Sequence, residues 1–244
     1  MSTTAVIPAL NEADAIGAVV RGVREAGVGD VIVVDNGSDD GTGERAREAG
    51  ARVVREPRRG YGRACRAGVQ AVPEGTALVL FLDGDGSDDP RDIPALLAPL
   101  VAGTYDFVIG SRTRGAREPG SLNASQLLAG RLAGMAMRTL YGVRYSDMCP
   151  FRAIRSGALT SLGMREETYG WNLEMQMRAA QAGLRILEIP VRHRHRRGGH
   201  SKVSGSFTGT IRAATRLATT LVRLAVSRRD APRVPNEADS ADRV

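Results

Sequence analysis

The chain has 244 residues, with 34 Lys and Arg against 27 Asp and Glu and a formal net charge of +7. Its 42% hydrophobic and 25% charged residues are ordinary for a globular protein, which excludes wholesale disorder. No apolar run approaches the roughly 20 residues that span a bilayer, and the N-terminus lacks the basic start of a signal peptide. Two cysteines without metal-ligand spacing favour a reducing compartment, so we expect a cytoplasmic protein.

The positive charge is almost entirely arginine, because Lys202 is the only lysine in the chain. A GC-rich genome would produce the same bias, so the placement of the arginines carries more weight than their number. A basic protein favours nucleic acid, a membrane surface or a phosphorylated substrate as its partner, and the arginine fork suits phosphate. Four Phe, one Trp and five Tyr offer few rings for base stacking, so we expect no nucleic-acid partner.

Short apolar runs alternate with helical stretches in the first 110 residues. Buried strands are predicted at 5–7, 31–34, 52–54, 78–82 and 107–109, and helices at about 13–26, 43–50, 60–72 and 90–102. Asp89 followed by Pro90 is a typical helix start. The alternation predicts an α/β fold with a doubly wound, mostly parallel sheet.

The pattern changes after residue 120. A long helix is predicted over 123–140, with Met135 and Met137 expected in the core rather than in a lipid groove. A strand near 151–154, a helix at 171–182 and a strand at 184–189 follow, and residues 192–202 carry five formal positive charges. The spacing of apolar residues and arginines over 207–229 predicts an amphipathic helix. This helix either packs on the protein or lies on anionic lipid. The tail 231–244 is expected to be disordered.

Acidic turns follow two of the predicted strands, at the edge where parallel sheets bind ligands. Asp83 and Asp85 can share Mg²⁺ or Mn²⁺ with a diphosphate, since two carboxylates and phosphate oxygens suit these hard cations. Asp35 can accept hydrogen bonds from a base or a ribose. Each turn alone is more typical of a solvated loop, so only their combination favours a ligand site.

Taken together, residues 6–12, 33–42 and 82–85 resemble the opening of a family 2 glycosyltransferase with the GT-A fold. The resemblance is closer to the branch of dolichyl- or polyprenyl-phosphate sugar synthases, and it continues through 110–112, 147–153, Glu174 and 199–202. It covers roughly residues 3–205. It implies a GT-A domain over 1–206. Beyond that domain, the residue pattern alone assigns 207–230 to the amphipathic helix, at the membrane surface or packed on the protein, and 231–244 to the tail.

The resemblance also implies roles for individual residues. The base and ribose of the donor would contact Pro8, Leu10, Glu12, Val33 and Asp35. The diphosphate would contact Asp83, Gly84, Arg112, Arg196 and Lys202, and the metal would be held by Asp85 and Ser87. The phosphate of a lipid acceptor would meet Arg112, Arg117 and Arg131. His193, His195 and His200 are not expected to hold a metal, because the surrounding arginines repel cations.

The need for a general base depends on the acceptor. A lipid phosphate is already ionised near neutral pH and needs no strong base, whereas a hydroxyl must lose its proton to a carboxylate within hydrogen-bond reach. Asp147 and Glu174 are the candidates for that carboxylate. Glu174 lies on a predicted helix, where a solvent-exposed position is an equally good interpretation.

We therefore expect a metal-dependent, inverting transferase that moves one sugar from a GDP- or UDP-linked donor to polyprenyl phosphate at the cytoplasmic face of a membrane. A soluble glycosyltransferase that acts on a small-molecule hydroxyl stays open as an alternative. A non-catalytic module that binds nucleotide sugar or lipid is another. A nucleotidyltransferase is a third, although it would normally open with a glycine-rich, basic loop that residues 8–12 do not form.

Overall fold

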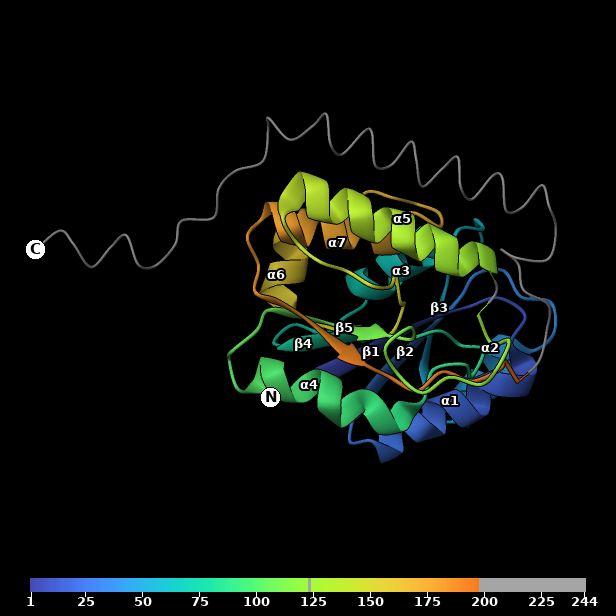
Figure 1. The fold of residues 1–244 in the computed structure, drawn as a ribbon. Coiled ribbons are helices and arrows are strands. Elements are labelled where there is room, and N and C mark those ends of the chain that lie inside the picture. The colour runs from blue at the N-terminus through green and yellow to red at the C-terminus, as the bar shows by residue number, and fades with distance from the viewer. Residues whose placement is uncertain (123, 198–244) are drawn as a thin grey trace, which may run out of the picture.

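The computed structural model describes residues 1–122 and 124–197, apart from the side chains at 124–126 and 129. Its described strands form one sheet in the order β3-β2-β1-β4-β6-β5-β7 (Figure 1). The strands are β1 (Thr3–Ala9), β2 (Asp30–Asp35), β3 (Arg52–Arg55), β4 (Leu78–Phe81), β5 (Phe107–Ser111), β6 (Arg152–Arg155) and β7 (Ile186–Pro190). The apolar runs predicted as strands all fall on these elements.

The sheet is mostly parallel, as the sequence predicts. The one antiparallel strand within the described residues is β6, which pairs with β4 on one side and β5 on the other. The central strand β1 is buried on both faces, because helices cover the sheet from both sides. This arrangement confirms the α/β, doubly wound fold class.

Helices form two layers around the sheet. In Figure 1, α1 (Ala13–Glu25) and α4 (Ile93–Val101) lie below it, with α2 (Thr42–Glu48) packed on α1. Above it lie α3 (Tyr61–Gln70), α6 (Ser156–Ser161) and α7 (Trp171–Gln181). The predicted helix start is present, since Asp89 caps a 3₁₀ turn, η1 (Pro90–Asp92), directly before α4. The short helix α6 was not predicted.

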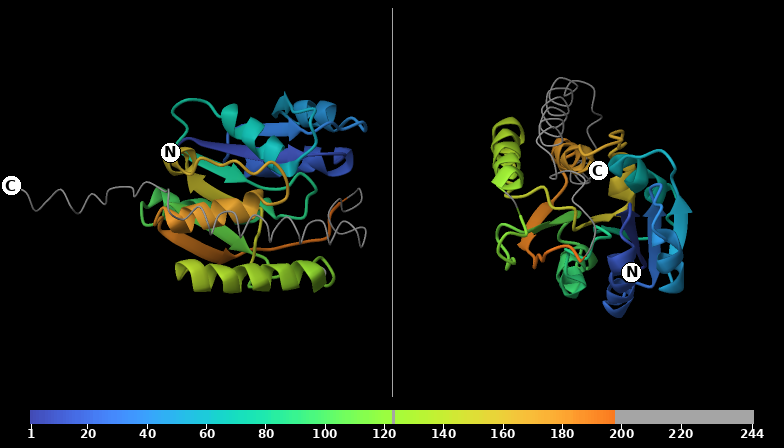
Figure 2. Two further views of the ribbon diagram at one scale, coloured as in Figure 1. Left: turned by 90° about the horizontal axis from the view of Figure 1, so that it is seen from above. Right: turned by 90° about the vertical axis from the view of Figure 1, so that its right-hand side faces the viewer.

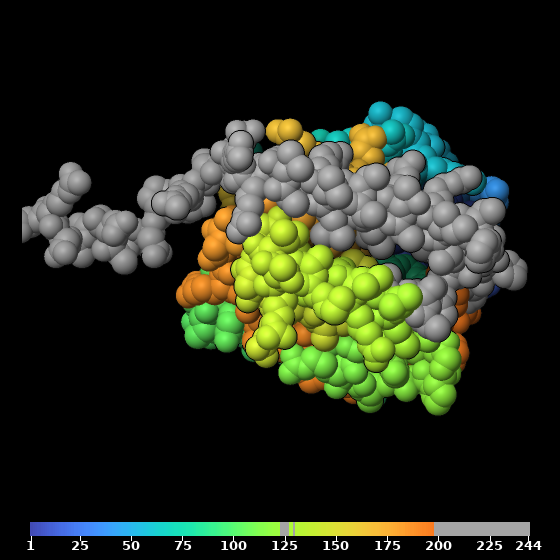
Figure 3. Space-filling model, turned by 45° about the horizontal axis from the view of Figure 1, so that its top comes forward, coloured from blue at the N-terminus to red at the C-terminus, as the bar shows by residue number. Residues whose placement is uncertain are grey.

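The helix α5 (Ala124–Tyr141) packs on α7 at the β7 side of the molecule, away from β3 (Figure 2). Its inner side buries Ala133 and Met137. Its outer side exposes Leu128, Leu132 and Met135 by 58%, 52% and 61%, and we call these three residues the α5 stripe. Figure 3 shows α5 at the molecular surface. The prediction for Met137 is therefore confirmed, and the prediction for Met135 is wrong.

After β7 the chain turns back across the ends of other strands. Residues 191–197, which we call the strap, run beside the loop that follows β4. Arg194 donates its backbone N–H to the Ser87 carbonyl at 2.9 Å, and Arg197 donates to the Asp85 carbonyl at 2.9 Å. The strap therefore brings a late part of the chain to the acidic loop.

Several predictions lie outside the described residues, namely Lys202, His200, the helix 207–230 and the tail 231–244. Within residues 1–122 and 124–197, no helix has both the length and the apolar character that crossing a bilayer requires.

Candidate active site

A cavity of about 730 Å³ opens at the carboxyl ends of β1, β4 and β5. Ligands bind at this edge of a parallel sheet because the loops that follow the strands converge there. The predicted site residues in its lining are Pro8, Leu10, Glu12, Asp83, Gly84, Asp85, Ser87, Arg112 and Arg196. The structure therefore brings the acidic motif, the β1 end and two predicted phosphate-binding arginines to one cavity.

The loop after β4 concentrates negative charge. Asp83 accepts a hydrogen bond on Oδ1 from the Tyr61 hydroxyl at 3.1 Å, and Asp85 accepts one on Oδ1 from the Ser87 backbone N–H at 2.9 Å. Burial, and then the charges of Asp85 and Asp88, raise the pKa of Asp83 well above its ordinary value. A cation in the cavity would relieve this repulsion.

Arg196 links three parts of the site. Its Nη2 lies 2.8 Å from Asp85 Oδ2 and 3.2 Å from Glu12 Oε1, so the strap, the acidic loop and the end of β1 meet on one guanidinium. An arginine in this place can hold a diphosphate beside the acidic loop. Arg196 thus lies beside the acidic motif, and its contact with a diphosphate stays a prediction.

Two carboxylates at the start of α4 anchor the strap. Arg194 Nη2 lies 2.5 Å from Asp89 Oδ2, and Arg192 Nε lies 2.9 Å from Asp92 Oδ1. Burial of Asp89 opposes its ionisation, but hydrogen bonds from Arg91 and the charge of Arg194 outweigh burial and lower the pKa of Asp89 to about 2. Asp89 is therefore ionised at neutral pH and holds the strap electrostatically.

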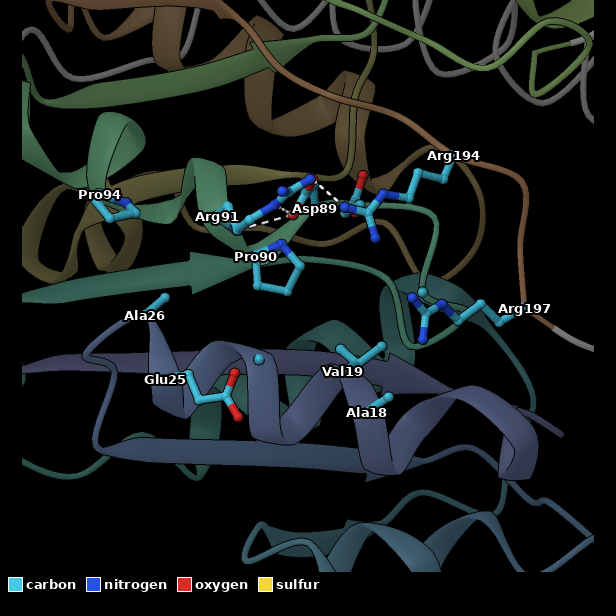
Figure 4. A pocket seen from close by; sticks show the side chains of 13 residues that line it. Ala18, Val19, Glu25, Ala26, Asp89, Pro90, Arg91, Pro94, Arg194 and Arg197 are labelled. Carbon is cyan, nitrogen blue, oxygen red and sulfur yellow. Dashed lines mark hydrogen bonds and ion pairs between the residues drawn. The ribbon is translucent and has the colours of Figure 1, made fainter.

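This anchor lines a second pocket of about 510 Å³ between α1 and η1 (Figure 4). Figure 4 shows the side chains of Arg91 and Arg194 meeting on Asp89, above the small side chains of Ala18 and Val19. Both guanidiniums are paired with Asp89, and Arg194 belongs to the strap. This pocket therefore lies where the strap is attached to the rest of the domain.

Arg112 follows β5 and lines the cavity, where Asp147 holds it. Asp147 Oδ2 accepts from the Arg112 backbone N–H at 3.0 Å and from Nε at 2.8 Å, and Oδ1 accepts from Nη2 at 2.8 Å. Burial alone would raise the pKa of Asp147, but the hydrogen bonds and charge of Arg112 lower it. Asp147 itself is buried behind Arg112 and is not among the lining residues.

Glu174 is fully buried on α7 and lies outside the cavity lining. Its Oε2 accepts from the backbone N–H groups of Arg165 and Glu166 at 2.9 and 2.6 Å, and its Oε1 accepts from Arg178 Nε at 2.8 Å. Both oxygens are therefore engaged: Oε2 joins α7 to the loop before it, and Oε1 pairs with Arg178 on α7 itself. Nothing in this arrangement resembles the exposed helix position that the sequence also allowed.

Four further predicted residues lie outside the lining. Val33 is buried inside β2, and Asp35 is buried at its end, where Oδ1 accepts from the Ser38 backbone N–H at 2.9 Å. Arg117 is exposed and pairs with the strap through a backbone bridge to His193. Arg131 is exposed on the outer side of α5. For all four, the structure leaves the ligand contact a prediction.

The cavity also contains residues that the sequence patterns did not indicate, chiefly Asn36, Tyr61, Ser121, Tyr169 and His193. Asn36 carries a usable signal, because it directly follows the predicted strand 31–34 and Asp35, whereas Tyr61 lies at the start of a predicted helix. The others come from loops whose position depends on tertiary packing.

Comparisons with known proteins identify the family of the chain. Residues 4–163 match the model of glycosyl transferase family 2. An uncharacterized glycosyltransferase of Mycobacterium tuberculosis is 40% identical over 86% of this chain and 93% of its own length. The undecaprenyl-phosphate mannosyltransferase of Micrococcus luteus is 31% identical over 86% and 90%, and the polyprenol monophosphomannose synthase of Mycolicibacterium smegmatis is 30% identical over 84% and 82%.

The fold has solved relatives as well. Glucosyl-3-phosphoglycerate synthase from Mycobacterium tuberculosis superposes with a TM-score of 0.76 at 23% identity, over 97% of this chain and 81% of that one. This likeness confirms the GT-A fold, and the named curated relatives confirm the resemblance to the polyprenyl-phosphate sugar synthase branch. The chain belongs to glycosyl transferase family 2 and is a glycosyltransferase.

Proposed function

We propose that the protein transfers one sugar from a nucleoside diphosphate donor, linked to UDP or GDP, to polyprenyl phosphate. The observation that carries the proposal is the state of the two candidate bases. Asp147 is held by Arg112 and Glu174 is buried with both oxygens bonded, so neither is available to take a proton from a hydroxyl. A phosphate acceptor needs no such base, since its second pKa is about 6.

The acidic loop fits a divalent cation. Asp83, Asp85 and Ser87 offer the oxygen ligands that Mg²⁺ and Mn²⁺ prefer, at a point where negative charge is crowded. In the part of the chain that the structure describes, no three His, Cys, Asp or Glu side chains gather closely enough to hold a metal. Donor diphosphate oxygens would complete the coordination, since phosphate oxygens are common ligands of these hard cations. The cation would neutralise the leaving diphosphate.

The arginines of the cavity then take separate roles. Arg196 holds the donor diphosphate beside Asp85, and Lys202 is proposed to assist it. Arg112 orients the acceptor phosphate, with Asp147 fixing its guanidinium. One phosphate oxygen forms a bond to the anomeric carbon while the bond from that carbon to the donor diphosphate breaks. Attack from the opposite face inverts the configuration of the sugar.

The outer side of α5 supports contact with a membrane, where polyprenyl phosphate resides. The α5 stripe follows helical spacing, and the exposed Arg131 and Arg138 lie on the same helix. Exposed apolar side chains beside arginines are typical of helices that lie on anionic lipid. We propose that α5 faces the lipid, with Arg117 and Arg131 near the lipid phosphates, and that the helix 207–230 adds to this contact.

The proposal is tested by incubating the full chain and Mn²⁺ or Mg²⁺ with radiolabelled UDP- and GDP-sugars, with and without polyprenyl phosphate. We expect label that extracts into butanol only when the lipid is present. The matched control is the Asp85→Asn variant, which should form no lipid-linked label. A water-soluble product whose yield ignores the lipid would contradict the proposal and favour the small-molecule hydroxyl acceptor.

A further inference from the structure

The turn of residues 56–62 lies beside the acidic loop and contains a tyrosine that contacts it. Tyr61 is the first residue of α3, and its hydroxyl donates to Asp83 Oδ1 at 3.1 Å. No described residue hydrogen-bonds to the second oxygen, Oδ2, so Asp83 keeps one oxygen for a ligand in the cavity that both residues line. The tyrosine therefore sets which way this carboxylate faces.

Asn36 holds the turn from the β2 side. Its Nδ2 donates to the carbonyls of Glu56 and Arg58 at 2.8 and 2.9 Å, and its Oδ1 accepts from the Gly60 backbone N–H at 2.8 Å. Only an amide supplies donors and an acceptor together at this position. An aspartate of the same shape would place a negative oxygen against two carbonyl oxygens.

The turn is also held from the opposite side. The backbone N–H groups of Gly62 and Arg63 donate to the carbonyls of Thr168 and Glu167 at 3.1 and 3.0 Å. A Cβ on Gly62 would lie only 2.2 Å from the Glu166 carbonyl oxygen, so glycine is required for this approach. The start of α3 is thus fixed by the Asn36 side chain on one side and by the 166–168 backbone on the other.

We infer that Asn36 and Tyr61 are positioning residues for Asp83: Asn36 fixes the 56–62 turn, and the turn presents the Tyr61 hydroxyl that orients the Asp83 carboxylate toward the metal and the donor diphosphate. The inference rests on the proposed function, because it takes Asp83 as a contact of that complex. A hydrogen bond to a carboxylate contributes more than one between neutral groups, so its loss should be measurable.

The test uses Tyr61→Phe, which keeps the ring and removes only the hydroxyl. Calorimetry is run with Mn²⁺ alone, and then with UDP and with GDP in the presence of Mn²⁺. We expect the affinity for the Mn²⁺–diphosphate complex to fall by about ten- to a hundredfold, the size expected for one hydrogen bond to a charged group. The matched control is Tyr141→Phe, whose hydroxyl accepts from Gln181 Nε2 at 3.0 Å at the far end of α5. It should leave this affinity unchanged.

The second variant is Asn36→Asp, and we expect it to lower the affinity for the same Mn²⁺–diphosphate complex. In the double variant the two losses should not add, because both act on one carboxylate. Wild-type affinity in Tyr61→Phe, or full additivity, would overturn the positioning role while leaving the proposed function intact. A wild-type chain that binds neither diphosphate with Mn²⁺ would instead overturn the proposed function, and the role of Asp83 in donor binding with it.

Discussion

The buried pair of Arg112 and Asp147 gives a sharp test of the site. Their side chains are only 13% and 6% exposed, so solvent screens the pair little. Removing one partner of a buried ion pair costs about 3–5 kcal/mol, and Asp147→Asn, which keeps the shape and one acceptor, should cost somewhat less, about 2–4 kcal/mol. The measurement is urea unfolding of wild type and variant at pH 7.

The difference in the free energy of unfolding between wild type and Asp147→Asn should depend on pH, and this dependence tests whether the difference comes from charge. Arg112 lowers the pKa of Asp147 below its unfolded value of about 3.9, so the stabilisation is complete above that pH and is lost as the pH falls through the folded value. The gap between wild type and Asp147→Asn should therefore close below about pH 4. A gap that persists at low pH would refute the reasoning, because it would then come from packing rather than from charge.

Three further predictions concern the cavity and its surroundings. Asp85→Asn should reduce metal-dependent transfer by at least about 100-fold, measured as lipid-linked label, and transfer that persists would contradict the metal assignment. Arg196→Gln should raise the KM for the donor by about tenfold through loss of its charge-assisted contact, whereas Arg197→Gln, an exposed neighbour, should not. Changing the α5 stripe to serine should reduce sedimentation with anionic liposomes at little cost in thermal stability, since these side chains are exposed. The control there is Val101→Ser, another exposed apolar position.

Much of the fold follows from local sequence patterns. Continuous apolar runs mark strands that are covered on both faces, and they predict β1, β2, β4 and β5 within a few residues. The direction of β6 could not be predicted in this way, because an antiparallel strand between two parallel ones depends on how distant segments pair. The helix α6 is only six residues long and too short to show helical periodicity.

The site residues, too, are predictable where local sequence patterns place them and not where they depend on distant contacts. Pro8, Asp83 and Arg112 lie at or just after the ends of strands, and the topology of a parallel sheet brings such positions together. Glu174 lies on a helix, where sequence alone does not reveal that the backbone of the loop at Arg165 and Glu166 engages its Oε2. Tyr61 was missed for a related reason, because its contact with Asp83 joins a helix start to a loop 22 residues away.

The strap also makes the cavity dependent on a segment of the chain that is synthesised late. Glu12 and Arg196 are 184 residues apart, yet their side chains meet in the folded protein. A nascent chain that has already formed β1 and β4 still lacks the cations that cover the acidic loop. The cavity is therefore completed only by residues that follow β7, so a chain synthesised no further than β7 would carry the acidic loop without Arg196.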